Sequence, residues 1–220
     1  MNPMTTSAPE IYQGQFGEFT INQSDRSGVI IYRAALMVAA LSFAIGSALV
    51  LLNNNSTVLN AITPLYACFS LALGVSLLTI HIYLAPLHRL LQVFWAIGSI
   101  TAIVLAFSNT EPLSVTVYTH PLTLLGVGFT FAALTGIYFK EAVCFNRLET
   151  KFLTPIVPSL LLGHMTGVLP SQWERVLLGT WAMLFVLFAL RKVVQAIPPD
   201  IGDKSVFAYL KAQKHSNPVH

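Results

Sequence analysis

Long apolar runs separated by short polar stretches dominate the chain. A helix needs about 20 apolar residues to cross the roughly 30 Å of hydrocarbon in a bilayer. Segments of about this length occur at residues 29–52, 60–84, 87–107, 121–139, 152–169 and 173–194. The pattern predicts an all-α fold, a polytopic transmembrane helical bundle with six spans.

Composition places this bundle in lipid. Hydrophobic residues make up 55% of the 220 residues and charged residues only 10%, and the mean hydropathy is +0.68. A typical soluble domain has about 25% charged residues. We expect one membrane domain at residues 29–194, with a polar N-terminal segment at 1–28 and a polar C-terminal tail at 195–220.

The N-terminal segment, residues 1–28, predicts local structure and how the first helix begins. Its stretch IYQGQFGEFTI, residues 11–21, predicts a small strand-like turn, a surface-lying piece or a tail packed partly on the bundle. Ser24 or Asp25 can cap the first helix. No basic start precedes an apolar run here, so we expect no cleavable signal peptide.

Basic residues predict the orientation of the bundle. With a cytoplasmic N-terminus, the six-span topology leaves Arg175 alone on the opposite side, and positively charged loops resist translocation. Both termini are then cytoplasmic, whereas five or seven spans would scatter the charges. The same topology separates Cys68 from Cys144, which excludes a disulfide between them. The basic residues on the cytoplasmic side are Arg26, Arg33, Arg89, Lys140, Arg147, Lys151, Arg191, Lys192, Lys204, Lys211 and Lys214.

His164 is a candidate contact for a pigment, a haem or a solute. At 1.5 Å per residue from Phe152 it lies roughly 18 Å into its span, past the midplane. Ionisable groups at such depth are functional candidates. Pro155 and Pro158 predict a broken helix before it. The alternative is a structural histidine bonded to a neighbouring carbonyl or hydroxyl.

His81 and His88 form a second candidate site. They flank the turn around Pro86, where the two rings could face each other and bind chlorophyll, haem or a metal. A metal site normally has three or four ligands, and no third ligand is adjacent in sequence. The alternative is a pair of interfacial residues beside Arg89. We predict no metal site.

The stretch KEAVCFNRLETK, residues 140–151, predicts a charged turn on the cytoplasmic face. Its charges are mixed, which is not typical of a patch for anionic lipid. The turn either docks a protein partner or is solvated with internal ion pairs. The docking candidates are Lys140, Glu141, Arg147, Glu149 and Lys151.

Catalytic chemistry is not predicted. Ser76 with His164 as its base would be an intramembrane nucleophile, but their depths of about 12 Å and 18 Å differ. No Asp, Glu, Lys or Arg occupies the middle of a span, which argues against proton-coupled carriers and ion pumps. No nucleic-acid partner is predicted either.

Four stretches together resemble a six-helix integral membrane protein family of unassigned function, found in cyanobacteria with relatives in plastids. The likeness covers about residues 10–212 and implies the thylakoid or plasma membrane of an oxygenic phototroph. It implies no catalytic residue, because the family has no established activity. The stretches are YQGQFGEFTI, SDRSGVIIYRA, FKEAVCF and LTPIVPSLLLGHMTG.

These observations favour a non-enzymatic accessory or assembly protein of a membrane complex, with photosystem subunits as expected partners. A bound chlorophyll or haem is a secondary hypothesis. The alternative function is a small-solute channel or facilitator with a path past His164.

Overall fold

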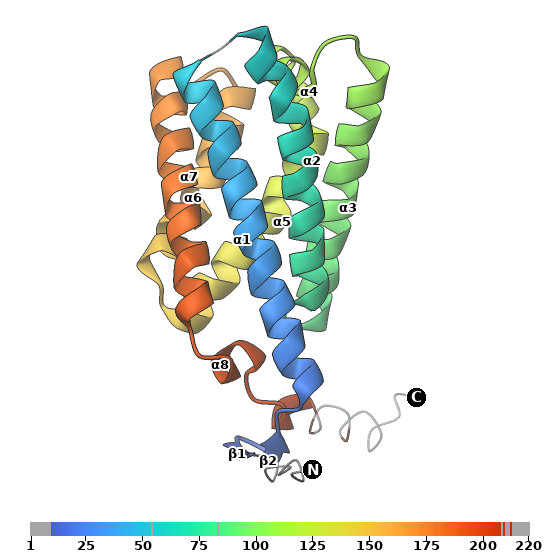
Figure 1. Ribbon diagram of the computed structural model, residues 1–220, viewed down its shortest axis with the longest axis vertical. Coiled ribbons are helices and arrows are strands. Elements are labelled where there is room, and N and C mark those ends of the chain that lie inside the picture. Colours follow the sequence, from blue (N-terminus) through green and yellow to red (C-terminus); the bar gives the residue numbers. More distant parts are fainter. Residues whose placement is uncertain (1–9, 54, 83, 208, 210–211, 213–220) are drawn as a thin grey trace, which may run out of the picture.

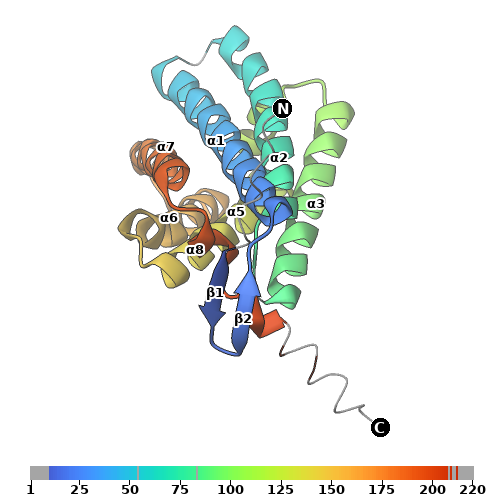
Figure 2. The same ribbon diagram turned by 60° about the horizontal axis from the view of Figure 1, so that its bottom comes forward.

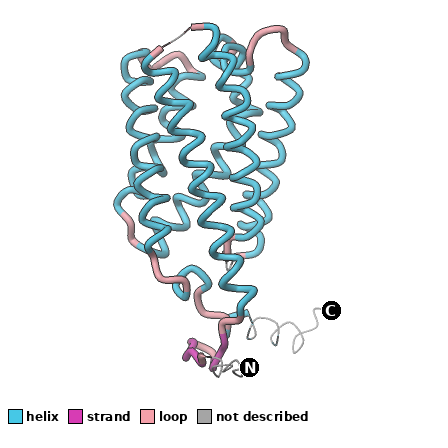
Figure 3. Tube along the Cα trace, viewed as in Figure 1, coloured by secondary structure: helices cyan, strands magenta, loops and turns pink. Residues whose placement is uncertain are grey.

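The computed structural model describes residues 10–53, 55–82, 84–207, 209 and 212 as an elongated bundle of antiparallel helices (Figures 1 and 3). A small hairpin lies below one end. The long helices are α1 (Gln23–Leu52), α2 (Ser56–Thr79), α3 (Ala85–Ser108), α5 (Leu124–Phe145), α6 (Leu148–Met165) and α7 (Ser171–Val194). The short elements are β1 (Ile11–Gly14), β2 (Gly17–Thr20), α4 (Leu113–Thr119), the 3₁₀ helix η1 (Pro121–Thr123) and α8 (Pro198–Ile201).

Among the described residues, five helices have the length and composition of a membrane span: α1, α2, α3, η1 with α5, and α7. The sixth predicted span corresponds to α6, which has only 18 residues. It includes Glu149, Lys151 and His164, and these polar side chains lower its apolar character. In the bundle α6 packs between α5 and α7.

Helix α6 is continuous, so the predicted break at its prolines is wrong. Both Pro155 and Pro158 lie inside the helix. Each removes one backbone donor, but the flanking Leu153 and Val157 are almost fully buried. Packing against the neighbouring helices keeps the remaining backbone hydrogen bonds of α6 intact.

The first helix begins at a capping box. Asn22 is the N-cap residue, and its side chain accepts from the backbone N–H of Asp25, whose carboxylate accepts in return from the N–H of Asn22. The predicted cap, Ser24 or Asp25, is therefore wrong, because the helix begins earlier in the chain. Asp25 occupies the third helical position of the box, where an acidic side chain also suits the helix dipole.

Helices α1, α2 and α7 form one group in the bundle, in which α1 packs on both α2 and α7. Helices α3 and α5 form a second group, and α6 joins the two because it packs on α5 and on α7 (Figure 2). Fully buried aromatic side chains fill the centre. Their largest members are Tyr32, Phe69, Tyr138, Trp181, Phe185 and Phe188.

The described parts of the two chain ends meet at one end of the bundle, called here the terminal end. Strands β1 and β2 form an antiparallel hairpin in which Ile11 pairs with Thr20. The N–H of Gln15 donates to Asp203 Oδ2 at 2.6 Å, and the N–H of Phe16 donates to Ser205 Oγ at 3.0 Å. The prediction of a small strand-like turn is confirmed.

Most of the basic side chains also lie at the terminal end. They come from the start of α1, α3 and α6 and from the end of α5 and α7 (Figure 1). Arg175 lies near the start of α7 at the opposite end, called here the far end. Lys211 and Lys214 lie outside the described residues.

Candidate functional site

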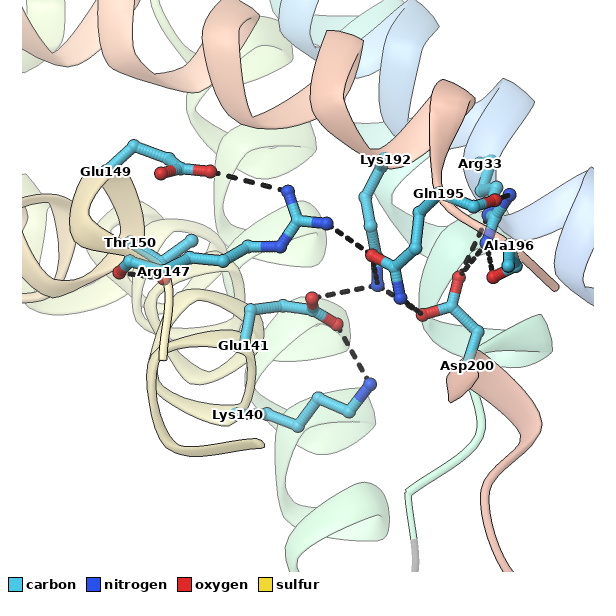
Figure 4. A network of polar contacts seen from close by, with 10 residues as sticks. All are labelled: Arg33, Lys140, Glu141, Arg147, Glu149, Thr150, Lys192, Gln195, Ala196 and Asp200. Carbon is cyan, nitrogen blue, oxygen red and sulfur yellow. Dashed lines mark hydrogen bonds and ion pairs between the residues drawn. The ribbon is translucent and has the colours of Figure 1, made fainter. Parts of the chain in front are cut away.

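A network of buried charges occupies the terminal end (Figure 4). At its centre the side chain of Lys192, on α7, is fully buried. Its ammonium group lies 2.8 Å from Glu141 Oε2 on α5 and forms a second ion pair with Asp200 on α8. The ring of Phe145 lies 4.3 Å below the same nitrogen. Two carboxylates and an aromatic face thus replace the water that the ammonium group lost.

Arg33 holds the segment after α7 against α1. Its Nε and Nη2 donate to Asp200 Oδ2 at 2.9 and 2.6 Å. It also donates to the backbone carbonyls of Gln195 and Ala196, at 2.5 and 2.9 Å. The guanidinium therefore satisfies a buried carboxylate and two carbonyls that no helix pairs, which explains why an arginine in α1 is only 7% exposed.

A second arm of the network joins α5, α6 and α7. Glu149 accepts from Arg191 at 2.7 Å and from Arg147 at 3.4 Å. Arg147 also donates to the side chain of Gln195, and Glu141 pairs with Lys140 at 2.9 Å. Five basic side chains thus surround three carboxylates, and the arrangement holds the four helices α1, α5, α6 and α7 together with α8.

The predicted charged turn at residues 140–151 is mostly helical. Helix α5 continues to Phe145 and α6 begins at Leu148, so the turn itself consists of Asn146, with φ at 51°, and Arg147. The prediction failed because it counted charged residues as loop, whereas their charges are neutralised inside the bundle.

The candidate docking residues divide by burial. Glu141 and Glu149 are buried and face inward, while Lys140 and Arg147 are half-buried within the same network. Lys151 is exposed. The internal ion pairs of the alternative interpretation are thus present, and docking of a partner by the exposed Lys151 stays a prediction.

His81 and His88 contact different neighbours. His88 Nε2 lies 2.6 Å from the carbonyl of Leu77 and 3.2 Å from the Gln92 side chain. His81 lies against α1, at Gly28. Burial lowers the pKa of His81, opposed by the nearby charge of Asp25.

No cluster of three potential metal ligands occurs within the part of the chain that the structure describes. The two cysteines, Cys68 and Cys144, are free and exposed.

A cavity of about 620 Å³ lies in the other half of the bundle, toward the far end. Helices α1, α2, α4, α5, α6 and α7 all contribute to its wall. Its floor is aromatic. The ring centroid of Trp181 lies 4.4 Å from that of Phe43 and, in an edge-on contact, 5.3 Å from that of Phe131. Its ionisable lining residues are His164, Glu174 and Arg175 together with Tyr66 and Tyr118.

His164 lies in the last turn of α6, at the polar end of this cavity. Its Nδ1 is 2.7 Å from Glu174 Oε1, and its Nε2 is 3.2 Å from the backbone carbonyl of Tyr118. The ring stacks on that of Tyr118 at 4.9 Å. Both ring nitrogens are engaged, so binding an iron or a magnesium would require one of these contacts to break.

The hypothetical Ser76–His164 pair does not form. Ser76 is fully buried in the last turn of α2, at the terminal end, whereas His164 ends α6 at the far end. The depth argument underestimated their separation, because α2 already ends at Thr79 and α6 already begins at Leu148, both earlier than the predicted spans.

Comparison with known protein families gives a match. A family described as uncharacterized integral membrane protein (DUF2301) matches residues 75–209, more than half of the chain. The chain belongs to this family. No curated protein matches, and no solved structure does.

The DUF2301 match covers α3 to α8 and the end of α2. It includes all three carboxylates of the buried network and the His164–Glu174 pair. Arg33 and Phe43, both on α1, lie outside it. Each of the two sites therefore combines residues of the matched region with residues of the first helix.

Sequence reasoning missed Lys192, Asp200 and Arg33 as members of one network. For Arg33 the sequence predicts only a place among the basic residues of the cytoplasmic side. A signal was present, since Asp200 follows two prolines after the last span and Lys192 lies in the last turn of that span. Their shared contacts depend on tertiary packing, which periodicity does not reveal.

Proposed function

We propose that this protein is a non-enzymatic accessory protein of the membrane that binds a small apolar molecule in the far-end cavity. The cavity itself carries the proposal. Ligand pockets typically measure about 300–1,000 Å³, with mostly apolar walls and a few polar groups that orient the ligand. A volume of about 620 Å³ with an aromatic floor and one polar end fits that description.

The floor of the cavity supports binding over permeation. Phe43, Phe131 and Trp181 close it toward the middle of the bundle. Below them Phe69 and Phe185 are at most 2% exposed. A solute that passed His164 would meet this packed aromatic layer, so a small-solute facilitator needs a rearrangement that a binding protein does not.

Co-purification tests the proposed binding. The full-length protein is extracted from its native membrane in mild detergent and analysed by native mass spectrometry, with an absorption spectrum of the same sample. We expect a bound small molecule and no visible bands. The variant Thr63→Phe, which fills the cavity from α2, should lose the bound mass.

A protein without any bound mass, whose heat stability in membrane lipid extract equals that of Thr63→Phe, would contradict the proposal. Visible absorption that disappears in His164→Leu would identify a pigment site instead.

The proposed topology has six spans, with α6 as the fifth and both termini cytoplasmic. The alternation of helix directions and the basic side chains at the terminal end support it. In a chain with Cys68 and Cys144 replaced by alanine, single cysteines at Asn109 and Gln13 test it. A membrane-impermeant maleimide applied to intact cells should label position 109 alone.

The proposed setting is the thylakoid or plasma membrane of an oxygenic phototroph, with photosystem subunits as partners. The resemblance of four stretches to cyanobacterial and plastid proteins supports this setting. Mass spectrometry of proteins that co-purify with the tagged chain tests it, and Lys151→Glu tests whether the exposed cation of the terminal end contributes to the contact.

A further inference from the structure

The size of the far-end cavity limits the length of its ligand. An engineered cavity of about 150 Å³ in another protein takes one benzene, with six carbon atoms. The cavity described here, at about 620 Å³, is roughly four times larger. By the same scale it holds on the order of 20 carbon atoms. That is the carbon content of one long alkyl chain, and the two chains of a bilayer phospholipid would not both fit inside the cavity.

Glu174 already has a partner in His164. A backbone carbonyl only accepts hydrogen bonds, so His164 Nε2 donates to Tyr118 O at 3.2 Å. The other ring nitrogen, Nδ1, lies 2.7 Å from Glu174 Oε1. This contact with the imidazole offsets the repulsion that the Glu174 carboxylate would exert on an anion at this end.

Arg175 is then the uncompensated charge among the residues that line the cavity. Its Nη2 donates to the carbonyl of Leu51 at 2.6 Å. A guanidinium has five N–H donors, and for its remaining donors no acceptor is present in the described part of the chain. A carboxylate is the group that this fork binds best, through two parallel hydrogen bonds.

The start of α7 adds to the positive potential. Pro170 is its N-cap residue and provides no side-chain cap, and Ser171 lines the cavity. The free N–H groups and the dipole of a long helix favour an anion at this position. Arg175 and the helix start thus lie together at the polar end of an apolar cavity.

On these grounds, and resting on the proposed function, we infer that the cavity binds a single-chain amphiphile with an anionic head, of the fatty-acid class. The carboxylate lies at Arg175 and the start of α7, and the alkyl chain extends toward Phe43 and Trp181. Neutral alcohols of the same length fill the same space without the charged contact.

Photo-crosslinking tests this inference on the full-length protein in phosphatidylcholine nanodiscs. The probes are a diazirine analogue of palmitate and the matched analogue of hexadecanol. We expect the palmitate probe to label cavity residues about tenfold more than the alcohol, which corresponds to one charge-assisted hydrogen bond. Unlabelled palmitate should compete.

Three variants separate the contributions. Arg175→Gln keeps a donor for Leu51 and should lower palmitate labelling to the level of the alcohol. Arg175→Lys keeps the charge and should retain most of the preference. Arg89→Gln, an exposed arginine at the terminal end, is the matched control and should change nothing.

The outcomes distinguish a failure of the inference about the anionic ligand from a failure of the proposed binding in the cavity. Equal labelling by both probes in the wild type, unchanged in Arg175→Gln but lost in Thr63→Phe, would overturn the anionic ligand and leave cavity binding intact. Absence of cavity labelling by either probe would overturn the inference together with the proposed function. The wild-type comparison needs no variant, so a poorly folding Thr63→Phe would not obstruct the test.

Discussion

At the residue scale, the buried ions of the terminal end show how one charge depends on several partners. Lys192 faces Glu141 and Asp200, and each carboxylate has a second cation, Lys140 and Arg33 respectively. Desolvation of an ion costs several kcal/mol, which only close and complete pairing offsets. Removing one charged side chain of this network should therefore lower the free energy of unfolding far more than removing an exposed ion pair.

Lys192→Met is expected to destabilise the protein by about 3 kcal/mol. That is the lower end of the range for breaking a buried pair, because both carboxylates keep a second cation. Unfolding in mixed detergent micelles measures the loss. The neighbouring Arg191, whose side chain is 52% exposed and also ion-paired, is the control: Arg191→Met should cost at most about 1 kcal/mol. Equal losses would contradict a buried network.

His81 predicts a dependence of stability on pH. Its pKa in the folded protein is lowered, first by burial and then by the charges of Lys140 and Lys204, against Asp25 and Asp200. The unfolded chain therefore binds the proton more readily. The contribution of His81 is complete above its ordinary pKa of about 6.5 and is lost as the pH falls toward the lowered value.

The melting temperature should thus fall between pH 7.5 and 5.5 more steeply in the wild type than in His81→Gln. Parallel curves for the two proteins would show that His81 does not titrate in this way.

At the element scale, small residues set how closely helices approach. A Cβ atom added at Gly98 on α3 would overlap the side chain and backbone of Thr130 on α5. A Cβ at Gly128 would meet only Leu124, at 3.9 Å. Close approach of backbones at glycine is the usual way in which membrane helices gain contact. Gly98 therefore fixes the packing of α3, the long helix with the least buried surface.

Gly98→Ala should destabilise the protein by about 1–3 kcal/mol, since a helix backbone must move to admit the methyl group. Gly128→Ala should be neutral or stabilise by up to about 1 kcal/mol, because alanine is the better helix former. Unfolding in micelles compares the two, and a loss in Gly128→Ala that equals that in Gly98→Ala would refute the close approach.

The helices themselves follow from the sequence more fully than their ends do. Apolar runs locate the five long spans because lipid leaves no other partner for backbone groups. The ends depend on side-chain contacts: α5 extends past the predicted Phe139 because Glu141 is neutralised by a lysine of α7. The far-end cavity could not be predicted, since Glu174 meets His164 only after two helices pack.

At the scale of the whole molecule, the hairpin and the tail make one assembly at the terminal end. Asp203 accepts from Gln15 N–H and from the hydroxyl and N–H of Ser205. Gly14 leaves the space for this contact, because a Cβ there would overlap Asp203 and Ser205. The clustering of basic residues anticipated this shared end, but the pairing of residue 15 with residue 203 depends on a contact that no local pattern encodes.

Asp203 predicts an acid-sensitive tie between the two ends. The Ser205 hydroxyl, and then the Gln15 N–H, lower the pKa of its carboxyl below the ordinary value of 3.8. The contribution is complete above that value and is lost as the pH falls through the lowered one. Protection of the Gln15 amide from hydrogen exchange, corrected for intrinsic rates, should fall between pH 4.5 and 2.5. Asp203→Asn should show weak protection throughout, and strong protection in that variant would rule out the tie.

The pairing of Arg33 with Asp200 has a consequence for biosynthesis. The two residues are 167 positions apart, and ribosomes add roughly 5–20 residues per second. Roughly 8–33 s therefore pass between the synthesis of Arg33 and the synthesis of its counterion, Asp200. Throughout that interval the nascent chain exposes an unneutralised cation at the membrane boundary, where insertases and proteases can recognise it. Synthesis of the last segment ends this vulnerable period.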